Sequence, residues 1–282
     1  MRDGSFRVCL SLFKILESTK GNGMSYIVYK KEEHIAKITL NRPEAMNAFN
    51  SELITELIEA FGKVEEDKDV YCVVLDAAGE KAFSVGGDIK EEIRTTGAAA
   101  FDFGKLGKKC VNSVKNCRVP VICAVHGFCL GGGMEVVLVS DLTVAADNMK
   151  IGMPTIKLGT IPGWGSTKTL ADVVGKGKAK ELMYTGKIIK AQEAYDLGIV
   201  QYIVPKEELM DKAMELAFEI ADKAPIAMKT MKECIDKGWE MSCEEAFEME
   251  TEKFAMCYDT EDKFEAMSAF LEKRDHKPYK YK

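Results

Sequence analysis

The sequence predicts an α/β protein, and three observations support that prediction. Strand-like and amphipathic helical segments alternate from about residue 24 to 205. Segments 70–78 and 119–127 are mostly apolar, as in strands that are buried on both faces of a parallel sheet. Residues 206–273 hold three or four helical segments without another strand pattern. We therefore expect a sheet-containing core followed by a helical C-terminal region.

Each expected element follows from its own pattern. Short runs rich in β-branched and aromatic residues predict strands, and apolar residues at a spacing of three or four predict helices. Glycine and proline mark the loops and helix ends. The expected strands are 26–30, 35–41, 70–78, 119–127, 142–147, 149–153 and 199–205, and the expected helices before residue 206 are 51–67, 98–116, a short helix after the glycines at 131–133, one from about Ser166, 177–186 and 190–198.

The chain divides into a first segment 1–23, a core 24–205 and a C-terminal region 206–282. Segment 1–23 is expected to be a leader, a tag or a disordered arm. Lys14 and Glu17 interrupt its short apolar stretch and no small-residue cleavage site follows, so we do not expect a signal peptide.

Composition excludes several classes of function. The net charge of −6 gives no basic surface for nucleic acid. The sequence contains no run of 18 uncharged apolar residues, so we expect no membrane span. The nine cysteines are scattered among apolar neighbours without a CxxC pair, which indicates reduced thiols and a cytoplasmic protein. With three histidines and no cysteine cluster, we expect no metal site.

Two glycine-bearing loops follow buried strands, "GEKAFSVGGD" ending at Asp88 and "GFCLGGGMEV" containing Glu135. In parallel α/β units such loops lie at the carboxyl ends of strands, where ligands bind. Backbone N–H groups freed by glycine suit the negative oxygen of an acyl transition state. Glu135 lies near a helix start but among apolar residues, a setting that tunes a carboxyl group for proton transfer.

Structural explanations compete with these functional ones. "LGGG" also suits tight packing, and Glu135 also suits an ion pair with an arginine. Asp141 is expected to cap or support a loop, His126 to be a core histidine, and Trp164 to be pocket wall or core. The "GTIPGWGSTKT" segment does not match a phosphate-binding loop.

Six segments in order resemble the crotonase superfamily, most closely the enoyl-CoA hydratases. They are "ITLNRPEAMNAFN", "AFSVGGDIKE", "AVHGFCLGGGMEVVLVSDLTVAAD", "LGTIPGWGSTKTL", "TGKIIKAQEAYDLGIVQYIVP" and "FEAMSAFLEKR", spanning about residues 26–273. The resemblance implies a spiral of ββα units with a helical C-terminal region that forms trimers or dimers of trimers. It also implies an acyl-CoA thioester as substrate, with coenzyme A as part of that substrate and no separate cofactor.

The resemblance carries over to particular residues. Val85 and Gly132 match the oxyanion-hole donors, and Glu135 matches the first catalytic glutamate. The residues expected to line the substrate, besides these donors, are Ala82, Gly86, Gly87, Asp88 and Trp164.

The second catalytic glutamate of the hydratases is replaced by Thr155, which lacks an ionising group near neutral pH and serves only as a hydrogen-bonding partner. Glu135 then either performs both proton steps of hydration, or supports a related reaction. The alternatives are a slow ordinary hydratase, an isomerase, a decarboxylase, and a hydratase of dienoyl or cyclic acyl-CoA. A non-catalytic acyl-CoA-binding protein is the third class, and the presence of Glu135 speaks against it.

Overall fold

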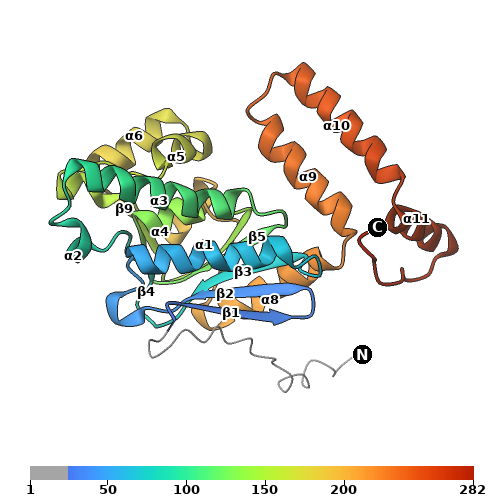
Figure 1. Cartoon of the computed structure of the whole chain (residues 1–282), viewed down its shortest axis with the longest axis horizontal. Coiled ribbons are helices and arrows are strands. Elements are labelled where there is room, and N and C mark those ends of the chain that lie inside the picture. Colours follow the sequence, from blue (N-terminus) through green and yellow to red (C-terminus); the bar gives the residue numbers. More distant parts are fainter. Residues whose placement is uncertain (1–24) are drawn as a thin grey trace.

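Two β-sheets and the helices around them form the core of the computed structural model (Figure 1). The structure describes residues 25–282, so the expectation for segment 1–23 lies outside the described residues. No helix in this described part is both long and apolar enough to cross a membrane.

The larger sheet has the strand order β1-β2-β3-β5-β7-β10. Its strands are parallel except β1, which pairs antiparallel with β2. Helices α1 and α3 cover one face and α8 covers the other (Figure 1). The bounds are β1 Ile27–Glu32, β2 Ile35–Leu40, β3 Cys72–Ala77, β5 Val121–Val125, β7 Leu142–Ala146, β10 Tyr202–Val204, α1 Ser51–Glu66, α3 Gly97–Lys115 and α8 Leu209–Ala221.

The smaller sheet has the strand order β4-β6-β8-β9. Of these four strands, only β8 was expected from the sequence. Strands β4 (Ala82–Ser84), β6 (Phe128–Leu130) and β8 (Lys150–Gly152) are parallel neighbours, while β9 (Ile188–Lys190) runs antiparallel to β8. Each of the three parallel strands follows a strand of the larger sheet, as β3–β4, β5–β6 and β7–β8. This repetition is the expected crotonase-type spiral of ββα units.

Local sequence explains the helix boundaries. The side chain of Asn50 accepts the N–H of Leu53 at 2.9 Å and caps α1, whose inward face buries Leu57 and Phe61. The remaining helices in the core are α2 Ile89–Glu92, α4 Gly132–Val137, α5 Ser166–Val174, α6 Lys176–Thr185 and α7 Ala191–Asp196, with short 3-10 turns at Pro43–Ala45, Pro154–Leu158 and Lys206–Glu208.

The C-terminal region begins later than the sequence indicated. Helix α8 buries Leu209, Ala213 and Leu216 against the larger sheet, so it belongs to the core rather than to the region 206–282. Helices α9 (Pro225–Gly238), α10 (Cys243–Tyr258) and α11 (Glu261–Glu272) stand apart from the sheets (Figure 1). We call α9 to α11 the C-terminal arm.

Candidate active site

The expected site segments follow three neighbouring strands of the smaller sheet. Residues 85–88 follow β4, residues 131–135 follow β6 and residues 153–155 follow β8. Because these strands are parallel, their carboxyl ends lie at the same edge. The Gly131 N–H donates to the Gly152 carbonyl at 3.1 Å, and a Cβ on Gly86 would lie 2.9 Å from the Leu130 carbonyl oxygen. The three segments therefore form one continuous edge.

The loop after β4 has one backbone N–H without an acceptor among the described residues, and it is that of Gly87. The Val85 N–H donates to the Met46 carbonyl at 3.3 Å, and the Gly86 N–H donates to Ser84 Oγ at 3.2 Å. The Asp88 N–H donates to the Phe49 carbonyl at 2.9 Å. The expectation that Val85 is an oxyanion donor is thus corrected, because its N–H already has a partner.

Two other residues expected at the substrate have structural roles. Ala82 is buried and its carbonyl accepts from Asn47 Nδ2 at 3.0 Å, so that carbonyl is not available to a ligand. Asp88 Oδ2 pairs with Arg42 at 2.7 Å, and Asp88 Oδ1 accepts the Lys90 N–H to cap α2. Burial alone would raise the pKa of Asp88, but these two partners outweigh it and lower the pKa.

Gly132 is the first residue of α4, where a helix leaves its N–H groups unpaired. Gly131 before it has a positive φ of 52°, which favours glycine. A Cβ on Gly132 would lie 2.5 Å from Cζ3 of Trp164. Glycine is therefore required here by the buried indole, and the Gly132 N–H has no acceptor among residues 25–282.

The Glu135 carboxylate is buried, with 4% of the residue exposed, and is held by the start of α5. Its Oε1 accepts the Trp164 N–H at 3.0 Å, the Ser166 N–H at 3.2 Å and the Ser166 hydroxyl at 2.9 Å. Burial raises the pKa of Glu135, and these donors oppose that shift. No arginine within residues 25–282 pairs with it, and its partners there are the donors from Trp164 and Ser166.

The second oxygen of Glu135 remains open. The three hydrogen bonds from Trp164 and Ser166 are all to Oε1, and the Gly165 N–H also lies close enough to the carboxylate to lower its pKa. Oε2 is also not one of the fully buried polar atoms without a partner. One carboxylate oxygen is thus fixed and the other is accessible, an arrangement suited to proton transfer. Ser166 was not among the residues expected at the site, because only its position at the start of a helix marked it.

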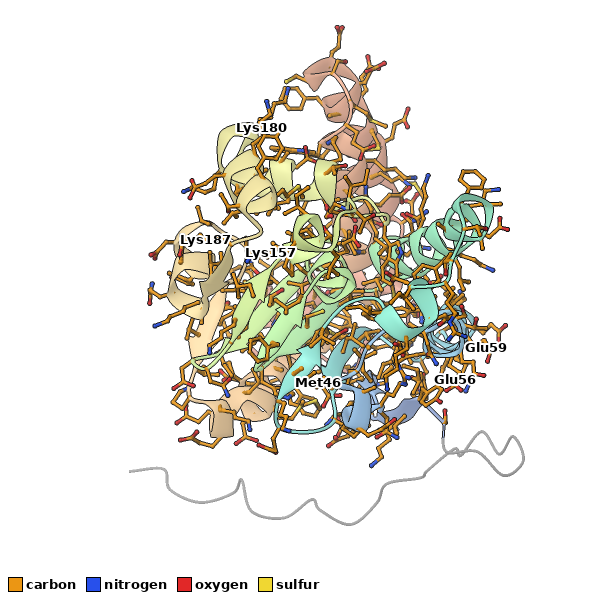
Figure 2. The ribbon with its side chains drawn as sticks, turned by 90° about the vertical axis from the view of Figure 1, so that its left-hand side faces the viewer. Met46, Glu56, Glu59, Lys157, Lys180 and Lys187 are labelled. Carbon is orange, nitrogen blue, oxygen red and sulfur yellow. The ribbon has the colours of Figure 1, made fainter. Side chains whose placement is uncertain are left out.

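Thr155 lies in the 3-10 turn after β8 and is partly buried. Met153, two residues earlier, places its sulfur 3.9 Å from Ser166 Oγ, which links this turn to Glu135. The stem of Lys157 lies against Gly186, and Figure 2 shows Lys157 on the side of the molecule that also carries Lys187. The Thr155 hydroxyl makes no hydrogen bond to a described residue.

Trp164 is buried and forms a wall beside Gly132. Its Nε1 would lie 1.9 Å from a Cβ on Gly107 of α3, so the indole fits between two glycines. Phe49 contacts it edge-on at a ring distance of 5.4 Å, and Phe103 lies at 6.0 Å. Trp164 also donates its backbone N–H to Glu135, so it combines the wall and core roles left open by the sequence.

Glu92, which was not among the expected site residues, lies against the loop that holds Gly87. A Cβ on Gly87 would lie 1.9 Å from Glu92 Oε1, so the carboxylate covers the glycine. Burial, followed by the charges of Asp88 and Glu91, raises the pKa of Glu92. Its only sequence signal was its place in "DIKEE" after the glycine loop.

Two other candidate residues have the structural roles expected of them. His126 Nε2 contacts the Gly79 carbonyl at 2.9 Å, and burial lowers the pKa of His126. Asp141 accepts the Val121 N–H at 2.8 Å and pairs with Lys232 of α9 at 2.5 Å, so it supports a loop and anchors the C-terminal arm.

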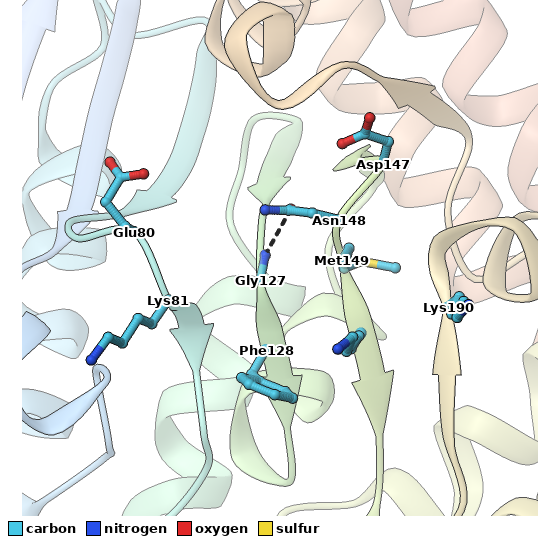
Figure 3. Close-up of a pocket in the computed structure, with 9 residues that line it drawn as sticks. Glu80, Lys81, Gly127, Phe128, Asp147, Asn148, Met149 and Lys190 are labelled. Atoms are coloured by element: carbon cyan, nitrogen blue, oxygen red, sulfur yellow. Dashed lines mark hydrogen bonds between the residues drawn. The ribbon is translucent and has the colours of Figure 1, made fainter.

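A groove of about 440 Å³ lies at the opposite, amino-terminal ends of β6 and β8 (Figure 3). The Gly127 N–H donates to Asn148 Oδ1 at 3.2 Å within it. Charges of both signs line it, so it favours no ligand class. The lining residues are Glu80, Lys81, Gly127, Phe128, Asp147, Asn148, Met149, Lys150 and Lys190. Within residues 25–282, no group of three or more His, Cys, Asp and Glu side chains is placed to hold a metal ion.

The fold and the carboxyl edge of strands β4, β6 and β8 together define a class of protein. A ββα spiral presents two open backbone N–H groups beside a buried carboxyl group, the equipment for stabilising an enolate formed from a carbonyl compound.

Comparison with known proteins agrees with that class. A family model described as enoyl-CoA hydratase/isomerase matches residues 30–280. The chain is 40% identical over 257 residues to a short-chain-enoyl-CoA hydratase of Clostridium acetobutylicum, covering 91% of this chain and 98% of the relative. It is 38% identical over 248 residues to a crotonyl-CoA hydratase of Syntrophomonas wolfei, covering 88% and 95%. The crystal structure of an enoyl-CoA hydratase from Bacillus anthracis matches with a TM-score of 0.89 at 35% identity, covering 91% of this chain and all of that one. The chain therefore belongs to the enoyl-CoA hydratase/isomerase family, within the crotonase superfamily.

Proposed function

We propose that the protein is an enoyl-CoA hydratase. Such an enzyme adds water across the 2,3 double bond of an enoyl-CoA thioester, or forms that double bond by removing water. The observation that carries this proposal is the Glu135 carboxylate, with Oε1 fixed by α5 and Oε2 open at the edge of the smaller sheet. The names of the two curated relatives support it, since both are hydratases of short enoyl-CoA thioesters.

The thioester oxygen is proposed to accept the N–H groups of Gly132 and Gly87. Both groups lack an acceptor among the described residues, and Gly86 packs directly against Gly132, with a Cβ position 3.1 Å from the Gly132 nitrogen. Donors that face the developing enolate oxygen lower the barrier by roughly 3–4 kcal/mol each. Trp164 is proposed to line the acyl group, because its indole packs on Gly132.

Glu135 is proposed to take a proton from the attacking water through Oε2. The three donors on Oε1 favour the ionised form that a base requires, although burial keeps the pKa above its usual value. Thr155 is proposed to stand in the position of the second glutamate of the family, where its hydroxyl holds water or a polar group of the substrate.

Thr155 also favours a second candidate function. An isomerase, a decarboxylase or a hydratase of dienoyl or cyclic acyl-CoA uses the same enolate, and isomerisation and decarboxylation do not require a second glutamate at this position. Mass spectrometry after incubation with a panel of thioesters separates the reactions: hydration adds the mass of water, isomerisation leaves the mass unchanged, and decarboxylation removes CO2.

Glu135→Gln tests the proposed role directly, because it keeps the shape and removes the titrating group. We expect the rate of hydration of crotonyl-CoA, measured by the loss of thioester conjugation, to fall by roughly 10²–10⁴-fold. Retention of near wild-type turnover in the purified variant would show that Glu135 is not the proton-transfer group.

The C-terminal arm is proposed to bury itself against copies of the same chain, as a homotrimer or a dimer of trimers. Trp239, Phe247 and Phe270 are 72%, 69% and 83% exposed in the single chain. Exposed apolar surface of this kind marks an interface. Light scattering of the purified protein measures the assembly.

Coenzyme A is proposed to enter only as part of the substrate. The cytoplasmic location stays a prediction, in keeping with eight free cysteines in the described part.

A further inference from the structure

We propose that Glu92 supplies the second proton-transfer group, in place of the carboxylate that is absent at position 155. The proposal rests on the hydratase function above and adds a catalytic residue from a different element, the short helix α2. With Thr155 after β8, hydration is left with the one carboxyl group of Glu135, which follows β6, while Glu92 brings another to the carboxyl edge of β4.

The first argument is position. Glu92 Oε1 lies 1.9 Å from the position that a Cβ on Gly87 would occupy, so the carboxyl group is in contact with the residue whose N–H is open. The neighbouring Gly86 packs against Gly132. A thioester whose oxygen accepts both N–H groups would thus have Glu92 beside one donor, and Glu135 one helical turn after the other.

The second argument is the absence of a competing structural role. Among residues 25–282, no donor or cation contacts the Glu92 carboxylate. The adjacent Glu91 differs, because both its oxygens accept from Ser51 at the start of α1. The backbone of Glu92 is fixed, with its N–H bonded to the Asp88 carbonyl at 3.0 Å and its carbonyl accepting from Thr95 at 2.8 Å. The backbone thus fixes where the side chain starts, and the carboxyl group has no hydrogen-bonding partner among the described residues.

The third argument is charge. Burial is the largest cause that raises the pKa of Glu92, and the charges of Asp88 and Glu91 add to it. Burial raises the pKa of Glu135 as well, but there hydrogen-bond donors from Trp164 and Ser166 oppose the shift, whereas Glu92 has no such donor among the described residues. The two groups are therefore suited to opposite tasks, Glu92 as acid and Glu135 as base.

The proton balance of hydration follows from these tasks. Glu135 accepts one proton of water while the water oxygen bonds to C3 and the C2–C3 π electrons form the enolate. The Glu92 carboxylic acid then delivers its proton to C2, and the thioester carbonyl re-forms. The net change is the addition of one water, and proton exchange with solvent returns Glu135 to the anion and Glu92 to the acid.

Glu92→Gln in the full-length protein tests the proposal, with Glu91→Gln as the matched control. With crotonyl-CoA as probe, we expect kcat of the Glu92 variant to fall by roughly 10²–10⁴-fold with little change in KM. We expect Glu91→Gln to stay within about twofold, because that carboxylate is bonded to Ser51. The pH profile adds a readout that a structural role would not move. Activity should fall as pH rises through the pKa of Glu92, and this alkaline limb should be absent from the residual activity of Glu92→Gln.

Rescue by a carboxylate from the other strand completes the test. In the Glu92→Gln background, Thr155→Glu should restore hydration by at least about tenfold, since it returns an acid to the site. A Glu92→Gln enzyme with wild-type kcat and an intact alkaline limb would overturn the proposal, and so would a loss confined to KM. If Glu135→Gln is inactive while Glu92→Gln is not, only this inference fails. If Glu135→Gln is fully active, the proposed function fails as well.

Discussion

The two sides of the candidate site surround their carboxyl groups with different hydrogen-bond donors and charges. On the side formed by α4 and α5, Glu135 is buried and its Oε1 accepts three hydrogen bonds. On the side formed by α2, Glu92 is partly exposed, has acidic neighbours and no donor in the described residues. The difference teaches that environment, rather than residue type, assigns the base and the acid.

Alanine substitutions of the two glycines beside these carboxylates should give the largest difference in kcat. In Gly132→Ala the new Cβ would meet the buried indole of Trp164 at 2.5 Å, and this packed ring cannot move away. We expect the Gly132 N–H to lose its alignment and kcat to fall by roughly 10²–10³-fold. In Gly87→Ala the Cβ meets only the end of the flexible Glu92 side chain.

The Gly87→Ala substitution, made in the Glu92→Gln background so that displacement of the acid does not contribute, should therefore cost about tenfold or less relative to that background. Steady-state hydration of crotonyl-CoA by both variants, after circular dichroism has verified the fold, makes the comparison. Equal losses would show that the two sides are equally rigid.

Ser166→Ala should have an intermediate effect on the Glu135 side. Removing one donor to the anion raises the pKa of Glu135 further. Because the base must be ionised, the acid limb of the pH–rate profile should move to higher pH, and kcat near neutrality should fall by up to about tenfold. Thr167→Ala, at the exposed next position of α5, is the control. An unmoved limb would contradict the positioning role of the Ser166 hydroxyl.

Thr155→Glu in the otherwise unchanged protein should have the smallest effect. If Glu92 already delivers the proton, a third carboxyl group adds little, and we expect a change in kcat of about twofold or less. The same initial-rate assay measures it. A gain of about a hundredfold would instead indicate that the natural enzyme lacks a second acid.

Much of the fold could be predicted because its signals are local. The alternation of buried strands with amphipathic helices, and the three or four helices expected after residue 206, follow from side-chain periodicity within each segment. The three-residue strands β4, β6 and β9 were missed, whereas β8 and β10, of the same length, lie inside the longer expected segments 149–153 and 199–205. The boundary at residue 206 was placed too early, because only tertiary packing shows that Leu209 and Leu216 cover the larger sheet.

For the site, the sequence alone determined the glycines at 131–133, the burial of Glu135 among apolar neighbours, and the absence of a carboxylate at position 155. These are properties of residue type and immediate context. Only the tertiary structure decided which backbone N–H is open. Val85 and Asp88 find their acceptors at Met46 and Phe49, about forty residues earlier, and this leaves Gly87.

The tertiary structure also decided the environments of the two carboxyl groups. Ser166 reaches Glu135 across 31 residues of sequence, and Glu92 reaches Gly87 because α2 turns back over its own loop. A carboxyl group acts as acid or base according to the donors and charges around it. Local sequence names the group, whereas the folding of distant segments supplies those donors and charges.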